Sequence, residues 1–318
     1  MKNKHNINLS DWIIYIGMIG IFFVFTVICS AMGKNFLNIN NVMNIVNQAS
    51  INAILAIGAS IVILTGGIDL SVGSVVGFVG IFLAMNIKSG MSIPVAIILC
   101  LICGAVIGLF NGILISYGKV PAFITTLGSM QAVRGLAQII NGGQAVSGFP
   151  LEIGALMKTK FFGVVPIGVL YVVIFYTVMI LVLSYTKFGR GIYALGGNSH
   201  AARLSGIKVK KLEVIVYILC GMFAAFAGVM LLARLLYADP SAGNSYEMNA
   251  IAAAVIGGIS MSGGKGKLAN TVVGAIILAT LTNGLQIMNV ATYYQTVITG
   301  LVVIIAVFAD KRKERKAE

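Results

Sequence analysis

The sequence predicts an all-α protein that crosses a membrane about ten times. Hydrophobic residues make up 58% of the 318 residues, charged residues only 10%, and long apolar runs recur along the chain. A soluble domain carries about 25% charged residues, so this chain has too few polar side chains to cover a water-soluble globule. The 38 glycines also suit membrane helices, which pack closely through small residues.

Each predicted span is a largely apolar run of about the 20 residues that a membrane helix needs. In order, the spans are Trp12–Met32, Val42–Leu64, Ser71–Ile87, Ile93–Tyr117, Ala122–Ile140, Val164–Tyr185, Val214–Leu236, Asn249–Met261, Leu268–Met288 and Thr292–Ala309. Asn249–Met261 is short, because as a helix it reaches only about 20 Å of a hydrocarbon core of about 30 Å. It is either a half-helix with a broken backbone or a span completed by Asn244–Met248.

Basic residues indicate how the chain is oriented. The net charge is +13, and the basic residues cluster at Met1–His5, Lys187–Lys211 and Lys311–Lys316, between apolar runs. Cytoplasmic segments of membrane proteins are enriched in Lys and Arg, so these clusters and both termini are expected in the cytoplasm. No basic stripe with groups that stack on bases is visible, so no nucleic-acid partner is expected. Two long loops, Asn141–Gly163 and Tyr237–Glu247, fall on the outside.

Two segments of the chain resemble each other. Ile51–Gly77 and Met248–Gly274 align without a gap, and both carry an early Asn and a Gly-Gly pair, Gly66-Gly67 and Gly263-Gly264. Chance similarity of apolar segments is the alternative, but the polar Asn and the Gly-Gly pair recur in register. We expect one transmembrane domain, 1–318, with a parallel internal repeat and broken or short helices near both pairs. Broken helices of transporter repeats lie near the substrate path.

Asp69, within TGGIDLSVGS, is the most informative single residue. A carboxylate between apolar helices is costly and usually functional. The favoured interpretation is that it caps the helix that starts near Ser71, by accepting hydrogen bonds from free backbone N–H groups. Direct contact with a transported solute and a proton relay are the alternatives. The relay is disfavoured because no other acidic residue lies in a predicted span.

Uncharged amides within or beside the spans are the other candidates for a polar path. Amides both donate and accept hydrogen bonds, which suits a neutral polyhydroxylated solute. For any single amide, a hydrogen bond between helices, worth about 0.6 kcal/mol, is the competing explanation. The candidates for the path or its support are Asn47, Gln48, Asn52, Asp69, Ser71, Asn111, Asn249, Asn283 and Gln286.

Glycines at intervals of four residues, Gly104, Gly108 and Gly112, lie on one helix face. Close helix packing explains this spacing. The same face is also a candidate for a subunit interface.

No catalytic or metal site is predicted, and no cofactor. His200 has no neighbouring ligands, and no G-x-x-x-x-G-K-[ST] sequence occurs, so the chain is not expected to bind ATP through a P-loop. If transport is driven by ATP, another subunit must hydrolyse it. This chain is therefore expected to be a transport subunit and not an enzyme.

The segment 187–213, which includes GRGIYALGGNSHAARLSGIKVKK, is the richest predicted cytoplasmic feature. One interpretation is a solvated basic loop. The other is a short cytoplasmic helix near Ser199–Gly206 that docks into a partner protein.

The motifs TGGIDLSVGS, YALGGN…AARLSGI, AIAAAVIGG and SGGKGK resemble the permease subunits of the ribose and related monosaccharide ABC importers. The resemblance runs from about Phe36 to Asp310. It implies a permease that moves a monosaccharide by alternating access, with ribose as the preferred candidate. Xylose, galactose, signalling furanoses and nucleosides are the alternative solutes within this family.

The resemblance also implies partners and a place in the cell. The partners are a second permease copy, a cytoplasmic ABC ATPase with two fused nucleotide-binding domains, and an extracytoplasmic sugar-binding protein, all at a bacterial cytoplasmic (inner) membrane. The family segment that contacts the ATPase matches Tyr193–Ile207. The coupling candidates are therefore Gly196, Asn198, Ala202, Arg203 and Gly206.

Two other classes of function were weighed against an ABC permease. An ion-driven secondary transporter needs membrane carboxylates for coupling, and only Asp69 qualifies. A membrane enzyme needs paired acids, a His cluster or an activated Ser, and the sequence offers none of these.

Overall fold

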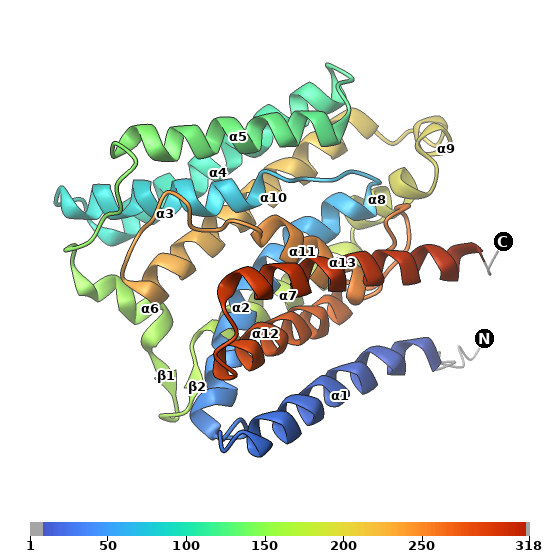
Figure 1. Ribbon diagram of the computed structural model, residues 1–318. Helices are drawn as coiled ribbons and strands as arrows, with labels where there is room; N and C mark the ends of the chain where they lie inside the picture. The colour runs from blue at the N-terminus through green and yellow to red at the C-terminus, as the bar shows by residue number, and fades with distance from the viewer. Residues whose placement is uncertain (1–8, 316–318) are drawn as a thin grey trace.

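The computed structural model describes residues 9–315 and is all-α, as the sequence predicts. Met1–His5 and Lys316, parts of two expected cytoplasmic clusters, lie outside the described residues. Every predicted span corresponds to a helix (Figure 1): α1 (Leu9–Ala31), α2 (Ile39–Leu64), α3 (Val72–Lys88), α4 (Ile93–Ser116), α5 (Ala122–Ile140), α7 (Gly168–Tyr185), α10 (Val209–Leu235), α11 (Tyr246–Ile256), α12 (Thr271–Ile287) and α13 (Thr292–Arg315).

Two predicted loops contain short elements. The loop after α5 holds η1 (Leu151–Gly154), α6 (Ala155–Lys158) and a hairpin of β1 (Lys160–Phe161) and β2 (Val165–Pro166), in which Phe161 pairs with Val165. The segment after α7 forms α8 (Lys187–Gly197) and α9 (Ser199–Leu204), and η2 (Leu268–Asn270) precedes α12. In Figure 1, α8 and α9 lie at the same end as the start of α1 and the end of α13, whereas α6 and the hairpin lie at the opposite end.

Six helical segments are long and apolar enough to cross a membrane by length and composition. They are Ile14–Ala31, α2, α4, α7, α10 and Leu268–Ile287. Three further apolar helices, α3, α11 and Thr292–Phe308, are shorter. These helices confirm a membrane protein with several spans.

Helix α11 is a half-helix. It has 11 residues, or about 16 Å, and starts at Tyr246, so residues before Asn249 do not lengthen it into a full span. The expected break near Gly263-Gly264 lies in the interruption between α11 and η2, and the helix already ends at Ile256 with Gly257 as its cap. Gly258 has a φ of 87°, a left-handed conformation that glycine adopts without strain and that stops the helix.

Helices α2 and α10 form the centre of the molecule. Of the most apolar window in each helix, 83% is buried in α2 and 72% in α10, but only 11% in α1. Helix α2 packs on α7, α10, α11 and α12, and α10 packs on α2, α3 and α4. The outer helices α1, α4, α7 and α13 expose large apolar side chains, among them Ile19, Phe23, Ile98, Val106, Val173, Leu181, Val297 and Ile305. Such extended apolar surface fits contact with lipid.

Glycines bring α4 and α10 into backbone contact. A Cβ atom at Gly104 would overlap the carbonyl oxygen of Gly221, and one at Gly108 would overlap that of Tyr217. The glycine face of α4 is therefore used for packing inside the chain and not for a subunit interface. This contact is of the kind that small residues allow between membrane helices.

We expect Gly108→Ala to destabilise the protein by about 1–3 kcal/mol, because the new methyl group must push two backbones apart. Thermal unfolding of the protein in detergent measures the effect. Gly135→Ala in α5 is the matched control, since a Cβ atom there meets nothing within 4 Å. Equal unfolding temperatures for the two variants would contradict this account of the α4–α10 contact.

Candidate functional site

A cavity of about 560 Å³ lies between α2, α11, α12 and α13. Its volume is within the range of about 300–1,000 Å³ that small-molecule sites occupy. Its lining residues are Gln48, Asn52, Asn244, Ser245, Tyr246, Met248, Asn249, Thr282, Gln286, Thr292, Gln295, Thr296, Thr299, Gly300, Val303 and Ile304. We call this space the amide cavity.

Four of the predicted path residues, Gln48, Asn52, Asn249 and Gln286, meet in the amide cavity. Within the part of the chain that the structure describes, the four side-chain amides make no hydrogen bond to other protein groups, and no charged side chain lines the cavity. Amides left free in this way can pair with the hydroxyls of a solute. A solute with a net charge would find no opposite charge there.

The helix geometry explains why these residues converge. Gln48 and Asn52 are four residues apart in α2 and therefore share one face. Asn249 lies in the first turn of α11, and Gln286 lies in the last turn of α12. The start of α11 and the end of α12 thus come together beside α2.

The sequence analysis missed the polar face of α13. Thr292, Gln295, Thr296 and Thr299 all line the amide cavity. Their spacing places them on one side of a helix whose opposite side is apolar. That spacing is visible in the sequence. It was not predicted because only amides were considered as path residues, and three of these four residues are threonines.

Asp69, Ser71 and Asn111 do not line the amide cavity but form a separate buried network. The Asp69 Oδ1 atom accepts hydrogen bonds from the Ser71 N–H at 2.9 Å and the Ser71 Oγ at 2.6 Å. Asn111 Nδ2 donates to Ser71 Oγ at 3.0 Å. Ser71 immediately precedes α3, so this geometry favours the capping interpretation of Asp69. Asn111 ties α4 to the start of α3.

Asn283 holds two helices together outside the cavity lining. Its Nδ2 atom donates to Asn41 Oδ1 at 3.0 Å and so joins α12 to α2. Only 3% of Asn283 is exposed. Asn283 therefore makes the kind of interhelical hydrogen bond that was the alternative to a role in the path.

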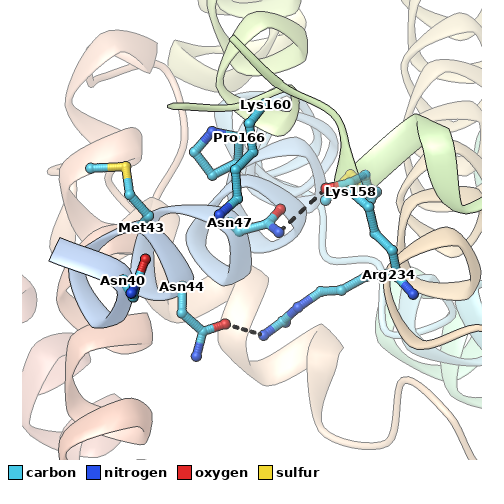
Figure 2. Close-up of a pocket in the computed structure, with 9 residues that line it drawn as sticks. Asn40, Met43, Asn44, Asn47, Lys158, Lys160, Pro166 and Arg234 are labelled. Atoms are coloured by element: carbon cyan, nitrogen blue, oxygen red, sulfur yellow. Dashed lines mark hydrogen bonds between the residues drawn. The ribbon is translucent and has the colours of Figure 1, made fainter. Parts of the chain in front are cut away.

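Asn47 belongs to a second pocket, of about 380 Å³, at the end of the molecule that carries α6 and the hairpin (Figure 2). Arg234 Nη2 donates to Asn44 Oδ1 at 3.2 Å across this pocket, and Asn47 Nδ2 reaches the Met157 carbonyl at 3.5 Å. The described lining contains three cationic side chains and no carboxylate. It consists of Asn40, Met43, Asn44, Asn47, Met157, Lys158, Lys160, Pro166 and Arg234. We call it the cationic pocket.

The five coupling candidates have different structural roles. Asn198 caps α9, because its Oδ1 atom accepts from the N–H groups of His200 at 3.0 Å and Ala201 at 2.9 Å. Ala202 is buried, and Gly206 turns the chain with a φ of 81°. Gly196 packs against the end of α2. Arg203 is the candidate that exposes a side chain able to contact a partner.

The structure adds two features to this segment. Residues 187–197 form a helix, α8, where the sequence predicted a loop. Leu204, at the end of α9, is 77% exposed beside Arg203. A shallow pocket next to them is lined by Tyr117, Arg203, Ile207, Lys208, Val209, Lys210 and Lys211. An exposed apolar side chain with a basic rim favours a docking surface over a merely solvated loop.

Comparison with known proteins identifies relatives over nearly the whole chain. Residues 41–307 match the family described as branched-chain amino acid transport system, permease component. The chain is 43% identical to the ribose import permease protein RbsC of Escherichia coli strain K12, over 92% of both chains. It is 38% identical to the D-allose transport system permease protein AlsC of that strain, over 92% of this chain and 91% of that one.

A third relative is the xylose transport system permease protein XylH of Haemophilus influenzae. The identity is 35%, over 99% of this chain and 100% of the relative. No solved structure matches the chain.

We expect Asp69→Ala to lower stability by about 1–3 kcal/mol, because Ser71 loses its buried acceptor. Asp69→Asn keeps a carbonyl oxygen at the same position and should be less severe. The yield of folded protein and its unfolding temperature measure the effect, and solute preference should not change in either variant. A stable Asp69→Asn protein with altered solute preference would show that Asp69 lines the path instead.

Proposed function

This chain belongs to the permease family of branched-chain amino acid transport systems. We propose that it is the membrane subunit of an ATP-driven importer of a monosaccharide, with ribose as the preferred solute. The observation that carries this proposal is the amide cavity, whose described lining is uncharged and presents the side-chain amides of Gln48, Asn52, Asn249 and Gln286 among others. Sugar hydroxyls both donate and accept, as amides do. The relatives named for ribose, allose and xylose support the same class of solute.

The amide cavity argues against an amino acid as the solute, although the family description mentions one. A free amino acid carries an ammonium and a carboxylate group, and burying either without a charged partner is costly. The described lining offers neither a carboxylate nor a cation. A neutral polyol avoids this cost.

The two ends of the molecule support the proposed partners. Helix α9 presents Leu204 and Arg203 for a cytoplasmic ATPase with two fused nucleotide-binding domains. The cationic pocket lies at the opposite end (Figure 1), where an extracytoplasmic sugar-binding protein would dock with carboxylates facing Lys158, Lys160 and Arg234. This orientation puts both termini in the cytoplasm. A second permease copy completes the proposed complex.

Alternating access explains how these parts act together. ATP binding closes the ATPase and moves α8 and α9, and the permease pair then opens toward the other side. The binding protein supplies most of the selectivity. The amide cavity needs only weak affinity, because each cycle must release the solute.

Reconstitution in proteoliposomes with the partner ATPase and sugar-binding protein tests the function. Uptake of labelled ribose that requires ATP and the binding protein is the expected result. Labelled xylose, allose and leucine are tested in the same assay as alternative solutes. Leucine uptake without sugar uptake, or sugar uptake that persists without the ATPase, would overturn the proposal.

We expect Asn249→Leu to reduce sugar uptake about tenfold or more, because a lost hydrogen-bond partner for a solute hydroxyl costs about 1–3 kcal/mol. Assembly with the ATPase should be unchanged. Asn86→Leu in α3 is the control, since that amide bonds to Phe82 in its own helix and does not line the amide cavity. Equal uptake by the two variants would exclude Asn249 from the path.

We expect Arg203→Glu to weaken co-purification of the ATPase without unfolding the permease, because it reverses an exposed charge beside Leu204. Lys88→Glu is the matched control: Lys88 is also exposed, but it bonds to Ser147, far from α9 in the sequence and the fold. Normal sugar-stimulated ATP hydrolysis by the Arg203→Glu complex would refute the assignment of α9 to docking.

A further inference from the structure

Three Gly-Gly pairs from distant parts of the sequence meet at one place. Gly66-Gly67 follows α2, Gly196-Gly197 ends α8, and Gly263-Gly264 lies in the loop between α11 and η2. The Gly264 N–H donates to the Leu64 carbonyl, the last residue of α2, at 2.9 Å. We call the contact among Leu64, Gly66, Gly196, Gly263 and Gly264 the glycine junction.

The junction has no room for a side chain at its centre. A Cβ atom at Gly196 would overlap the Leu64 carbonyl oxygen and would lie 2.5 Å from the Gly264 nitrogen. A Cβ atom at Gly263 would lie 3.0 Å from the nitrogen of Gly66 and from the oxygen of Gly196. The backbones of α8, α2 and the α11–η2 loop therefore touch one another directly. A direct backbone contact transmits displacement with little slack, since close-packed groups are hard to compress.

A second contact fastens α8 to the same loop. The Tyr193 hydroxyl, three residues before Gly196, donates to the Gly266 carbonyl at 3.0 Å. Burial raises the pKa of Tyr193 above its ordinary value, so the hydroxyl is a donor at neutral pH, as in any tyrosine. The loop is thus held to α8 at two points, Gly196 and Tyr193.

The proposed docking helix is joined to the junction by a short link. Asn198 directly follows Gly197, and its side chain caps α9 with two hydrogen bonds. Helices α8 and α9 also pack on each other, so a push on Arg203 or Leu204 reaches the end of α8 over a short distance. Helices α2, α11 and α12, which the junction contacts or connects, also line the amide cavity.

We propose that Gly196 is a positioning residue for transport: it joins the coupling segment to both Gly-Gly breaks, so that one movement of α8 and α9 shifts α2 and the α11–α12 pair together. This inference rests on the proposed function, because it needs an ATPase that moves α9. The structural basis of this coupling is the contact among the three backbones, which only glycine at position 196 permits.

The neighbouring glycine provides a matched control. A Cβ atom at Gly197 meets nothing within 4 Å, and neither Gly196 nor Gly197 has a positive φ. Gly196→Ala and Gly197→Ala therefore add the same methyl group one residue apart, in the same helix turn. Only the first forces the junction open.

The test compares both variants in proteoliposomes with the ATPase and binding protein. Gly196→Ala should still co-purify with the ATPase, but sugar moved per ATP hydrolysed should fall about tenfold. Gly197→Ala should match the parent protein in both measurements. Full coupling in Gly196→Ala, or an equal loss in both variants, would overturn the proposal.

Tyr193→Phe keeps the inference testable if Gly196→Ala does not fold. It removes one hydrogen bond to the loop and no packing volume, so the fold should persist. Sugar moved per ATP should fall about twofold to fivefold with ATPase binding intact. Unchanged coupling in this variant would count against the junction. A parent complex that shows no ATP-driven uptake would instead refute the proposed function, which separates the two failures.

Discussion

Lipid offers no hydrogen bonds, so every backbone group freed at a helix break must find a partner within the protein. The main features of this structure follow from that constraint. The chain stops being helical after Leu64 and after Ile256, and both breaks are partly buried: Asp69 and Gly263 are buried, whereas Gly66 and Gly258 are exposed. The Leu64 carbonyl at the end of α2 accepts from the Gly264 N–H, and the Asp69 carboxylate accepts from the Ser71 N–H at the start of α3. The turn after Ile256 is closed by local backbone bonds, such as that from the Ile259 N–H to the Ala254 carbonyl.

The space for a solute lies at the start of α11. The first turn of this 11-residue helix and the end of α12 face the amide cavity beside α2. The polar groups there are amides and hydroxyls, which can exchange partners with a passing solute at modest cost. Charged groups gather elsewhere, in the cationic pocket and along the basic rim near α9. This separation fits a path for neutral solutes with charged docking surfaces at its ends.

The glycines of this chain have distinct tasks. Gly104 and Gly108 let α4 and α10 touch, which builds a stable interior around α10. Gly258 ends a helix by its left-handed conformation. Gly196 instead lets the coupling segment touch two other backbones. A high glycine content therefore reflects close backbone approach at several kinds of site.

The sequence by itself determined the order of the ten long apolar segments, the membrane class and the family resemblance, and it left two alternatives for α11. These properties depend on local hydropathy and on short motifs, both of which are readable along the chain. It also favoured Asp69 as a cap, because the acceptor and the helix start are neighbours in sequence.

Only the tertiary structure decided which polar residues share a site. It gathered Gln48, Asn52, Asn249 and Gln286 with the polar face of α13, and it moved Asn111 and Asn283 into interhelical bonds. It also joined Gly196 to the two breaks. The physical reason is that hydropathy fixes whether a helix is buried in lipid or protein, but the packing of helix faces fixes which residues meet.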